Sequence, residues 1–426
     1  MAKTGIYVSL SDSQIGNNQS DESIAMIFAD APAISSTFLQ DKAYMITGLQ
    51  DAAALGITQE WETGQLDTSG SRLYTHIADF YANAGSGTKL WICGTTFTYG
   101  ESGSLSQASF YSGKVADAVM QTVENGYALR PRIFILCKGE KAAASTKYTS
   151  SVLNCDYDLT DIAAFQTFLE DMSNDNSIRM CGIYDGAFLN PATTPIDVTN
   201  LTDASGLNAP LVGYNITDIH GYGISSTGHV GGILSGRNIQ ASIGNVSLGS
   251  TVQKAYFTNV KNTSGSITYY KSGTPVSQLN NAKNDIIGEK GYVFLRTRPM
   301  ITGLFYNDGS TCNLSTNALS KLEMVRVGNA VCDDAQQFLT LYLNVNIPVE
   351  SDGTILASYK SSMSSDFYSR YIQPRLNAGQ ASDIRVTFSE KDGNYVQSKA
   401  IQCTVEILPS PAMEQGYVNV FYVSSL

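Results

Sequence analysis

The stretch FYSGKVADAVMQTVENGYALRPRIFILC, residues 110–137, contains a helix pattern followed directly by a strand pattern. Its first half places apolar side chains on one helical face, at Val115, Ala118, Val119 and Val123. Asn125 and Gly126 then form a pair that is typical of a helix C-terminus. Residues 132–137 continue with five apolar residues in a row, which is typical of a strand covered on both faces. This succession predicts one helix-to-strand step of an α/β sheet.

The same step recurs on both sides of that stretch. We expect further helices over residues 72–84 and 160–172, and further strands over residues 24–28, 89–93, 178–183 and 209–216. Strands that alternate with helices are joined by crossover connections, and such connections favour a parallel sheet. The sequence therefore predicts a mainly parallel α/β middle domain over residues 23–285.

The last third of the chain changes to an α+β order. Strands are expected over residues 291–298 and 299–306, a long helix from a cap at Asn317 to Leu343, a helix over residues 365–376 that Pro374 interrupts, and strands over residues 384–388, 401–407 and 417–423. The final three strands alternate apolar and polar side chains, which indicates one covered face. We therefore place a C-terminal α+β domain at residues 286–426.

Residues 1–22 precede both domains and are rich in Ser, Asn and Gln. Within them, Ile6, Val8 and Leu10 alternate with polar or aromatic neighbours at the period of a strand. No second strand pattern lies close enough in sequence to form a hairpin with this one. The segment is therefore either an edge strand of its own domain or an arm that pairs with another chain.

The composition of the 426 residues argues against several classes of protein. The formal net charge of −11 and the lack of any basic run argue against a nucleic-acid surface, which needs clustered Lys and Arg. No apolar stretch approaches the roughly 18 residues of a membrane span. Only 15% of the residues are charged, whereas ordinary soluble domains have about 25%. Such a polar but weakly charged surface is compatible with extensive protein–protein contact.

The seven cysteines are scattered, and Cys93, Cys137 and Cys181 lie in or beside apolar strand patterns. We interpret them as small buried hydrophobic residues rather than as disulfide partners or metal ligands. The first residues of the chain do not resemble a secretion signal. These two observations predict synthesis in a reducing cytoplasm.

Residues that could carry catalysis are few. Of the three histidines, His76 is expected on the surface of its helix or half-buried, while His220 and His229 flank glycine-rich sequence with too few neighbouring ligands for a metal. No nucleophile elbow or phosphate-binding loop is present, since the glycine-rich residues 85–88 precede a strand instead of following one. We therefore expect no enzyme activity, no cofactor and no metal.

Five segments also carry a family resemblance through their order along the chain. Residues 49–58 present a helix followed by Leu-Gly-Ile, residues 73–92 a helix and a strand, and residues 229–246 a helix of small residues and a loop. The strongest match covers residues 291–309, which end in Tyr-Asn-Asp-Gly. It continues over residues 322–353, which begin with a long helix pattern. In this order the segments resemble the contractile-tail sheath family, of the small type found in Mu-like phages and related contractile injection systems.

The resemblance implies a structural subunit that polymerises around an inner tube and contracts to drive that tube through a target envelope. The implied partners are copies of the chain in a helical lattice, an inner tail tube protein, and baseplate and tail terminator proteins. No direct contact with nucleic acid or membrane is implied. The assembly would be a virion tail built in the host bacterial cytoplasm or the sheath of a cytoplasmic injection system, and the sequence leaves both open.

In sheaths of this family, the terminal segments leave their own subunit and pair with sheets of neighbouring subunits. The corresponding residues here are Ile6, Tyr7, Val8 and Leu10 in the first segment, and Tyr417, Val418, Val420, Phe421 and Val423 in the last. The resemblance thus implies that the C-terminal domain is an assembly domain with exchanged terminal strands. Arg370 and Arg375 are candidates for a surface that faces the tube, and a plain solvated helix would explain them equally well.

Two alternatives come from other classes of protein. One is another phage or surface assembly protein, such as a tube, baseplate or surface-layer subunit. The other is a Rossmann-like enzyme with an added domain, which would need a glycine-rich turn after its first strand. Residues 93–96 do not supply such a turn.

Overall fold

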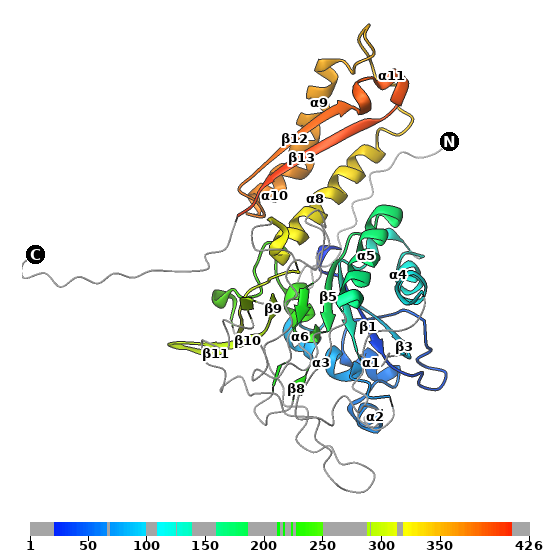
Figure 1. The fold of residues 1–426 in the computed structure, drawn as a ribbon, viewed down its shortest axis with the longest axis vertical. Helices are drawn as coiled ribbons and strands as arrows, with labels where there is room; N and C mark the ends of the chain where they lie inside the picture. Colours follow the sequence, from blue (N-terminus) through cyan, green and yellow to red (C-terminus); the bar gives the residue numbers. More distant parts are fainter. Residues whose placement is uncertain are drawn as a thin grey trace, which may run out of the picture.

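A computed structural model describes residues 21–65, 69–98, 109–124, 126–138, 159–185, 211–213, 216–217, 223–224, 227–249, 288–289, 291–312 and 318–410. Figure 1 shows a large α/β body and, standing on it, a smaller unit of helices with a two-stranded sheet. Helix α8 (Leu322–Thr340) runs from the body into the smaller unit, so the two parts share one element.

A seven-stranded sheet forms the centre of the body. Its strands lie in the order β2 (Tyr44–Ile46), β3 (Leu90–Thr95), β1 (Ala25–Asp30), β4 (Ile133–Cys137), β5 (Cys181–Asp185), β6 (Leu211–Gly213) and β9 (Tyr292–Val293). Every neighbouring pair is parallel except β2 and β3. The predicted mainly parallel sheet is therefore confirmed.

Helices cover both faces of this sheet, which is why its central strands are apolar throughout. Ile27, Ile92 and Ile135 face one core, which is completed by α3 (Leu73–Ala84) and α6 (Thr227–Gly236). Phe28 and Phe134 face the other core, which is completed by the π-helical segment η2 (Phe110–Val115), α4 (Ala116–Val123) and α5 (Leu159–Asn176). Helices α1 (Leu49–Ala54) and α2 (Gln59–Gln65) contact α3.

The cysteines that were predicted to be buried lie within these cores. Cys93, Cys137 and Cys181 are free thiols with almost no exposed surface. Burial raises the pKa of Cys93 to about 12 and that of Cys181 to about 11, so both stay protonated near neutral pH. They act as small apolar side chains, as the sequence predicted.

Helix α6 lies so close to α3 that only glycine fits at successive contact positions. A Cβ on Gly228 would lie 2.5 Å from the carbonyl oxygen of His76, and a Cβ on Gly236 would lie 3.0 Å from that of Asn83. Between them, a Cβ on Gly232 would overlap the carbonyl oxygen of Phe80. The three glycines recur every four residues and therefore line one face of α6. The two helices thus meet backbone to backbone.

The smaller unit packs helices against a two-stranded antiparallel sheet. Its elements after α8 are α9 (Ala357–Phe367), the π-helical segment η8 (Tyr368–Ile372), α10 (Gln373–Asn377), β12 (Asp383–Glu390), α11 (Tyr395–Ser398) and β13 (Ile401–Leu408). Aromatic rings hold its centre together, since the ring centroid of Phe338 lies 5.1 Å from that of Phe367 and 5.5 Å from that of Phe388.

Helix α8 contributes to the cores of both parts. Leu322 and Val325, in its first turns, lie in the core of the body. Val331 and Phe338, further along, lie in the core of the smaller unit. The body also takes up β9 and the start of the hairpin formed by β10 (Leu295–Arg298) and β11 (Ile301–Tyr306). The domain limits at residues 22/23 and 285/286 stay predictions.

Two expectations about the helices of the C-terminal part are corrected. The helix predicted over residues 365–376 begins earlier, at Ala357. Its first turns are rich in serine, and its only two buried side chains are Met363 and Phe367, so no apolar pattern marks its start. The chain stays helical through Pro374, since α9, η8 and α10 follow one another without a break from Ala357 to Asn377, but the π-helical segment η8 lies directly before α10, which carries this proline. The N-cap of α8 is Lys321, and the predicted cap Asn317 lies outside the described residues.

The remaining described elements are short. They are the 3-10 segments η1 (Asp21–Ser23), η3 (Tyr127–Leu129), η5 (Val246–Leu248), η7 (Ala318–Ser320) and η9 (Lys391–Gly393), and the small hairpin of β7 (Ile216–Thr217) and β8 (Gly223–Ile224). Among the helices that the structure describes, none is long and apolar enough to span a bilayer.

The close contact between α3 and α6 predicts the effect of adding one methyl group. Gly232→Ala should lower the free energy of unfolding by about 2–3 kcal/mol, because the new Cβ overlaps backbone that cannot move aside. Gly64→Ala in α2 is the matched control, since nothing lies within 4 Å of the added Cβ and alanine favours the helix by about 0.5–1 kcal/mol. Urea unfolding of both variants checks this, and equal stabilities would contradict the close approach.

Candidate assembly interface

At the carboxyl edge of the parallel sheet, where nucleotide-binding folds hold their ligands, the described residues at the ends of β1 and β3 are closely packed. The Asp30 carboxylate, at the end of β1, accepts a hydrogen bond of 3.0 Å from the backbone N–H of Phe97. The rings of Phe28, Phe97 and Phe110 pack together there, with centroids 5.0–5.9 Å apart. A Cβ on Gly94 would meet the ring of Phe38 at 2.7 Å.

A small polar cluster lies buried between α3, α6 and the end of β4. His229 Nε2 lies 3.3 Å from Asp79 Oδ1, and both side chains are buried. Thr227 Oγ1 lies 3.4 Å from His76 Nδ1 and 3.4 Å from Cys137 Sγ. In the described part of the chain, no group of three His, Cys, Asp or Glu side chains could hold a metal ion. The contact between His229 and Asp79 joins α6 to α3, and that between Thr227 and Cys137 joins α6 to the sheet.

His76 was expected to be exposed or half-buried, and this expectation is wrong. Helix α6 covers the face of α3 that carries His76, leaving the residue 1% exposed. Burial lowers the pKa of His76 to about 3, so the ring is neutral near neutral pH. His229 is buried as well, and His220 lies outside the described residues.

Ion pairs join the body to the smaller unit across the amino ends of two strands. Arg130 and Arg132, before β4, and Arg179, before β5, all reach the carboxylate of Asp333 on α8. The distance from Arg130 Nη2 to Asp333 Oδ2 is 3.1 Å, and that from Arg179 Nη1 to Asp333 Oδ1 is 2.6 Å. We call this group of four side chains the Asp333 joint. It holds α8 across the sheet edge.

A second set of contacts ties α10 to the same place. Arg375 Nη2 donates to Glu22 Oε1 at 2.9 Å and to the carbonyl oxygen of Ala330 at 3.3 Å. The Nε of Arg375 contacts the carboxylate of Asp334. Burial raises the pKa of Asp334, although the contact with Arg375 opposes that shift. Residue 22 and residue 375 thus meet at α8.

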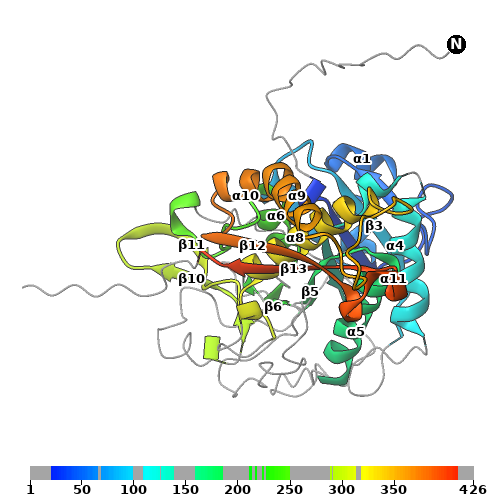
Figure 2. The same cartoon turned by 90° about the horizontal axis from the view of Figure 1, so that it is seen from above.

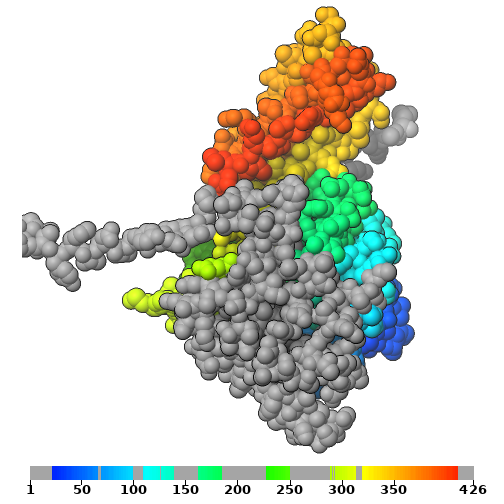
Figure 3. Space-filling model, viewed as in Figure 1, coloured from blue at the N-terminus to red at the C-terminus, as the bar shows by residue number. Residues whose placement is uncertain are grey.

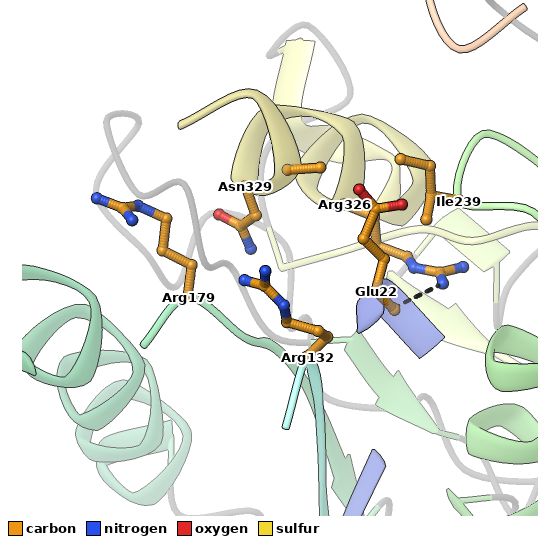
Figure 4. A pocket seen from close by; sticks show the side chains of 7 residues that line it. Glu22, Arg132, Arg179, Ile239, Arg326 and Asn329 are labelled. Carbon is orange, nitrogen blue, oxygen red and sulfur yellow. Dashed lines mark hydrogen bonds between the residues drawn. The ribbon is translucent and has the colours of Figure 1, made fainter. Parts of the chain in front are cut away.

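Beside these contacts lies a pocket whose lining comes from both parts of the molecule. It is lined by Glu22, Arg132, Arg179, Ile239, Arg326, Asn329 and Ala330. Figure 4 shows Arg132 rising toward α8, while Arg179 points away from the other side chains. Arg326 Nη2 lies 3.4 Å from the carbonyl oxygen of Glu22. Burial lowers the pKa of the Arg326 guanidinium. The seam between the two parts is thus strongly polar.

Strands β12 and β13 form a sheet of only two strands, each eight residues long. One face packs against the helices through Ile384 and Phe388, which lie in the core of the smaller unit. On the other face Arg385 Nη1 lies 3.4 Å from Glu406 Oε2 in an exposed ion pair. Within the described residues, neither strand pairs with a third one. As far as the described residues go, both edges of this sheet are therefore open to a further strand.

The residues predicted for strand exchange, Ile6, Tyr7, Val8, Leu10, Tyr417, Val418, Val420, Phe421 and Val423, all lie outside the described residues. Of the two arginines predicted to face a tube, Arg370 is 57% exposed and pairs with Asp366 one turn earlier. Arg375 lies in the contacts with Glu22 and Asp334 described above. The tube-facing role of both arginines stays a prediction.

Sequence reasoning did not find the Asp333 joint. A signal was present, since Arg130, Arg132 and Arg179 each precede a buried apolar strand and therefore lie at the amino edge of the sheet. The acidic partner could not be inferred, because Asp333 follows more than 150 residues later on a helix whose placement is set by the fold.

Comparison with known proteins places these observations in context. The profile of one family, described as DUF2586, N-terminal domain, matches residues 4–310, which is more than half of the chain. No curated protein matches the sequence. The fold is similar to that of a chain in the anti-feeding prophage (AFP) baseplate, 6-fold symmetrised, with a TM-score of 0.58, 10% identity, and 100% of both chains covered.

Two further solved structures are similar along their whole length. One is a chain of the PVC sheath complex of an extracellular contractile injection system in its contracted state, with a TM-score of 0.53, 11% identity, and 100% of this chain and 98% of that chain covered. The other is a chain of the AFP baseplate in its contracted state, with a TM-score of 0.52, 9% identity, and 99% and 98% covered. At these identities the similarity concerns the fold.

Breaking the Asp333 joint should cost far more stability than breaking an exposed ion pair. Asp333→Asn should lower the free energy of unfolding by about 3–5 kcal/mol, because three partly buried guanidinium groups lose one carboxylate. Asp366→Asn, which removes the partner of the exposed Arg370, should cost about 0.5 kcal/mol or less. Urea unfolding at one pH measures the free energy of unfolding of both variants. Similar losses would show that the Asp333 joint stabilises the fold no more than an exposed ion pair does.

The buried His76 predicts a loss of stability in acid. Its pKa of about 3 in the folded chain lies below the unfolded value of about 6.5, so the unfolded chain binds the extra proton as the pH falls from 6.5 to 3. The stabilisation is therefore complete above pH 6.5 and decreases by up to about 1.4 kcal/mol per pH unit below it. His76→Gln should show a shallower loss between pH 6.5 and 5 in calorimetry. Parallel profiles would contradict this.

Proposed function

This chain belongs to the DUF2586 family, and we propose that it is a structural subunit of a contractile tail sheath, which polymerises around an inner tube and contracts to drive that tube through a target envelope. The role is structural rather than enzymatic. The observation that carries the proposal is the two-stranded sheet of β12 and β13, whose two edges are open within the described residues.

Open sheet edges allow a protein to add further strands to them. Monomeric proteins usually cover or charge such edges, because unpaired backbone groups invite pairing with other chains. Two segments of strand character, residues 6–10 and 417–423, are available as donors from a neighbouring copy. Each added strand would form about four to six backbone hydrogen bonds at about 1 kcal/mol net each. In a lattice every copy repeats this gain.

The fold supports the same proposal. The solved structures that share it over whole chains include a sheath complex and a baseplate, both from contractile systems. The baseplate similarity also supports a narrower variant, in which this chain forms the first ring next to a baseplate. In either position its partners would be copies of itself, an inner tube protein, and baseplate and terminator proteins, in an assembly made in a bacterial cytoplasm.

The polar seam between the body and the smaller unit suits a subunit that moves relative to neighbouring copies while it stays folded. Strands that pair between copies can act as hinges while the α/β body rotates as a rigid part. The Asp333 joint would keep the body and the smaller unit together during this movement, because its ion pairs are specific in geometry. Arg370, on the exposed side of the smaller unit, is our candidate for contact with the tube.

The exchange of strands is tested by one proline. Val420→Pro removes a backbone donor from the middle of the segment 417–423, so the purified variant should stay monomeric where the unmodified protein forms tubes or rings in negative-stain micrographs. Ser424→Pro, just beyond the segment, is the matched control and should assemble normally. Deletion of residues 1–15 or 417–426 should likewise leave folded monomers.

Each part of the proposal has its own negative result. Tubes formed by Val420→Pro as readily as by the unmodified protein would rule out pairing through this segment. Unmodified protein that stays monomeric at every concentration and in the presence of a tube protein would rule out the sheath function itself. The comparison of the two proline variants requires that they have equal melting temperatures, so that a difference in assembly does not come from a difference in folding. Equal values are expected, because both changes lie outside the described residues.

A further inference from the structure

The hairpin of β10 and β11 projects from the side of the body. Figures 1 and 2 show it extending away from the other elements in two perpendicular views, and the space-filling view in Figure 3 shows it as a narrow protrusion. Arg298 pairs with Ile301, so Pro299 and Met300 alone form the turn at its tip. The tip is therefore a small, well-defined structure.

The tip carries two unfavourable features in one residue. Met300 has a φ of 62°, in the left-handed region where glycine or asparagine is expected after a proline in such a turn. Its side chain is fully exposed, and that of the neighbouring Ile301 is 47% exposed. A turn that only reversed the chain would do better with glycine at this position. An apolar side chain held out in water at the expense of backbone strain indicates a contact with another molecule.

A second apolar surface lies at the far end of the smaller unit, in the loop of residues 341–353 that follows α8. Its exposed apolar side chains are Leu341, Leu343, Val345 and Val349. The loop is held in place, because the backbone N–H of Tyr395 donates to the carbonyl oxygen of Gly353 at 2.9 Å and the Asn394 amide donates to that of Asp352 at 3.3 Å. It is thus an ordered apolar patch beside α11.

The charges of the hairpin and the loop are complementary. Residues 295–306 contain two arginines, Arg296 and Arg298, and no acidic residue. Residues 341–353 contain two acidic residues, Glu350 and Asp352, and no basic residue. Both acidic residues are exposed, and hydrogen bonds from Thr354 lower the pKa of Asp352, which keeps it ionised. Each surface thus combines exposed apolar side chains with charges of one sign, and the two signs are opposite.

The two surfaces cannot meet within one chain. In Figure 1 the hairpin lies low on one side, whereas α11, which holds the loop, lies at the top, and Figure 2 places the hairpin and α11 at opposite sides. We propose that the β10–β11 tip of one copy docks on the 341–353 loop of the next copy. Because the two surfaces differ, the contact is head-to-tail and generates a ring or a helix rather than a closed dimer. This inference rests on the proposed self-assembly.

The occupant of the loop is therefore a second copy of this chain. Met300 and Ile301 would cover the four apolar side chains of the loop. Arg298 donates to the carbonyl oxygen of Asn307 at 3.2 Å, so the positive charge of the hairpin lies behind its tip and would face Glu350 and Asp352 from there. The contact involves different residues from those of the strand exchange. It would determine the rotation between neighbouring copies, whereas exchanged strands link them flexibly.

The first test compares two exposed methionines. Met300→Asp should raise the protein concentration needed for assembly at least tenfold, measured by sedimentation, because a charge replaces the apolar tip and faces acidic residues. Met120→Asp is the matched control, since Met120 is also an exposed methionine but lies on α4 of the body, and it should assemble like the unmodified protein. Both variants should keep the melting temperature of the unmodified protein.

The second test uses covalent trapping in concentrated protein. Met300→Cys and Val345→Cys are prepared separately and mixed under mild oxidation, and a disulfide-linked dimer should form in the mixture well above the level in either variant alone. The linkage is then located by peptide mass spectrometry. This readout needs only the contact itself, so it also applies if no tubes form.

The outcomes separate the two proposals. Unchanged assembly of Met300→Asp, or no linked dimer in the mixture, overturns the head-to-tail contact. Binding of the hairpin to anionic lipid vesicles, lost in Met300→Asp and without any linked dimer, also overturns it in favour of a membrane contact. A linked dimer in protein that never forms tubes supports the contact and overturns only the sheath function.

Discussion

The carboxylate of Asp333 holds the molecule together in its described form. Three arginines from the edge of the central sheet converge on it, and the helix that carries it supplies side chains to two hydrophobic cores. A charge this poorly exposed is stable only when its partners are in place, so the position of α8 is coupled to the formation of β4 and β5. The orientation of the smaller unit follows from that coupling.

This arrangement differs from the way in which the body itself is built. The body relies on apolar layers on both faces of its sheet and on a backbone contact between α3 and α6 that tolerates no added atom. The seam relies on directional contacts between guanidinium and carboxylate groups, which lose their strength when the geometry changes. The molecule therefore combines a closely packed body with a seam whose strength depends on orientation.

Local sequence patterns predicted the body well. The helix and strand within residues 110–137 depend on periodicity and on a terminating Asn-Gly pair, and both are found near their expected positions. His76 was misjudged because the element that buries it, α6, lies about 150 residues later in the chain. The start of α9 was missed because a serine-rich turn has no apolar period. The Asp333 joint is a long-range pairing of charges, which no local pattern encodes.

The glycines of α6 also bear on how the chain reaches its folded state. A helix with four glycines in ten residues is a poor helix by itself, since each glycine costs about 1 kcal/mol relative to alanine. It becomes stable only when it docks on α3, and residues 76 and 227 must then meet although they are 151 positions apart in the chain. Contacts of such high sequence separation slow folding. The docking of α6 on α3 is therefore expected to be a late and slow step, so that newly made chains would spend time with most of the sheet formed and one of its faces still uncovered.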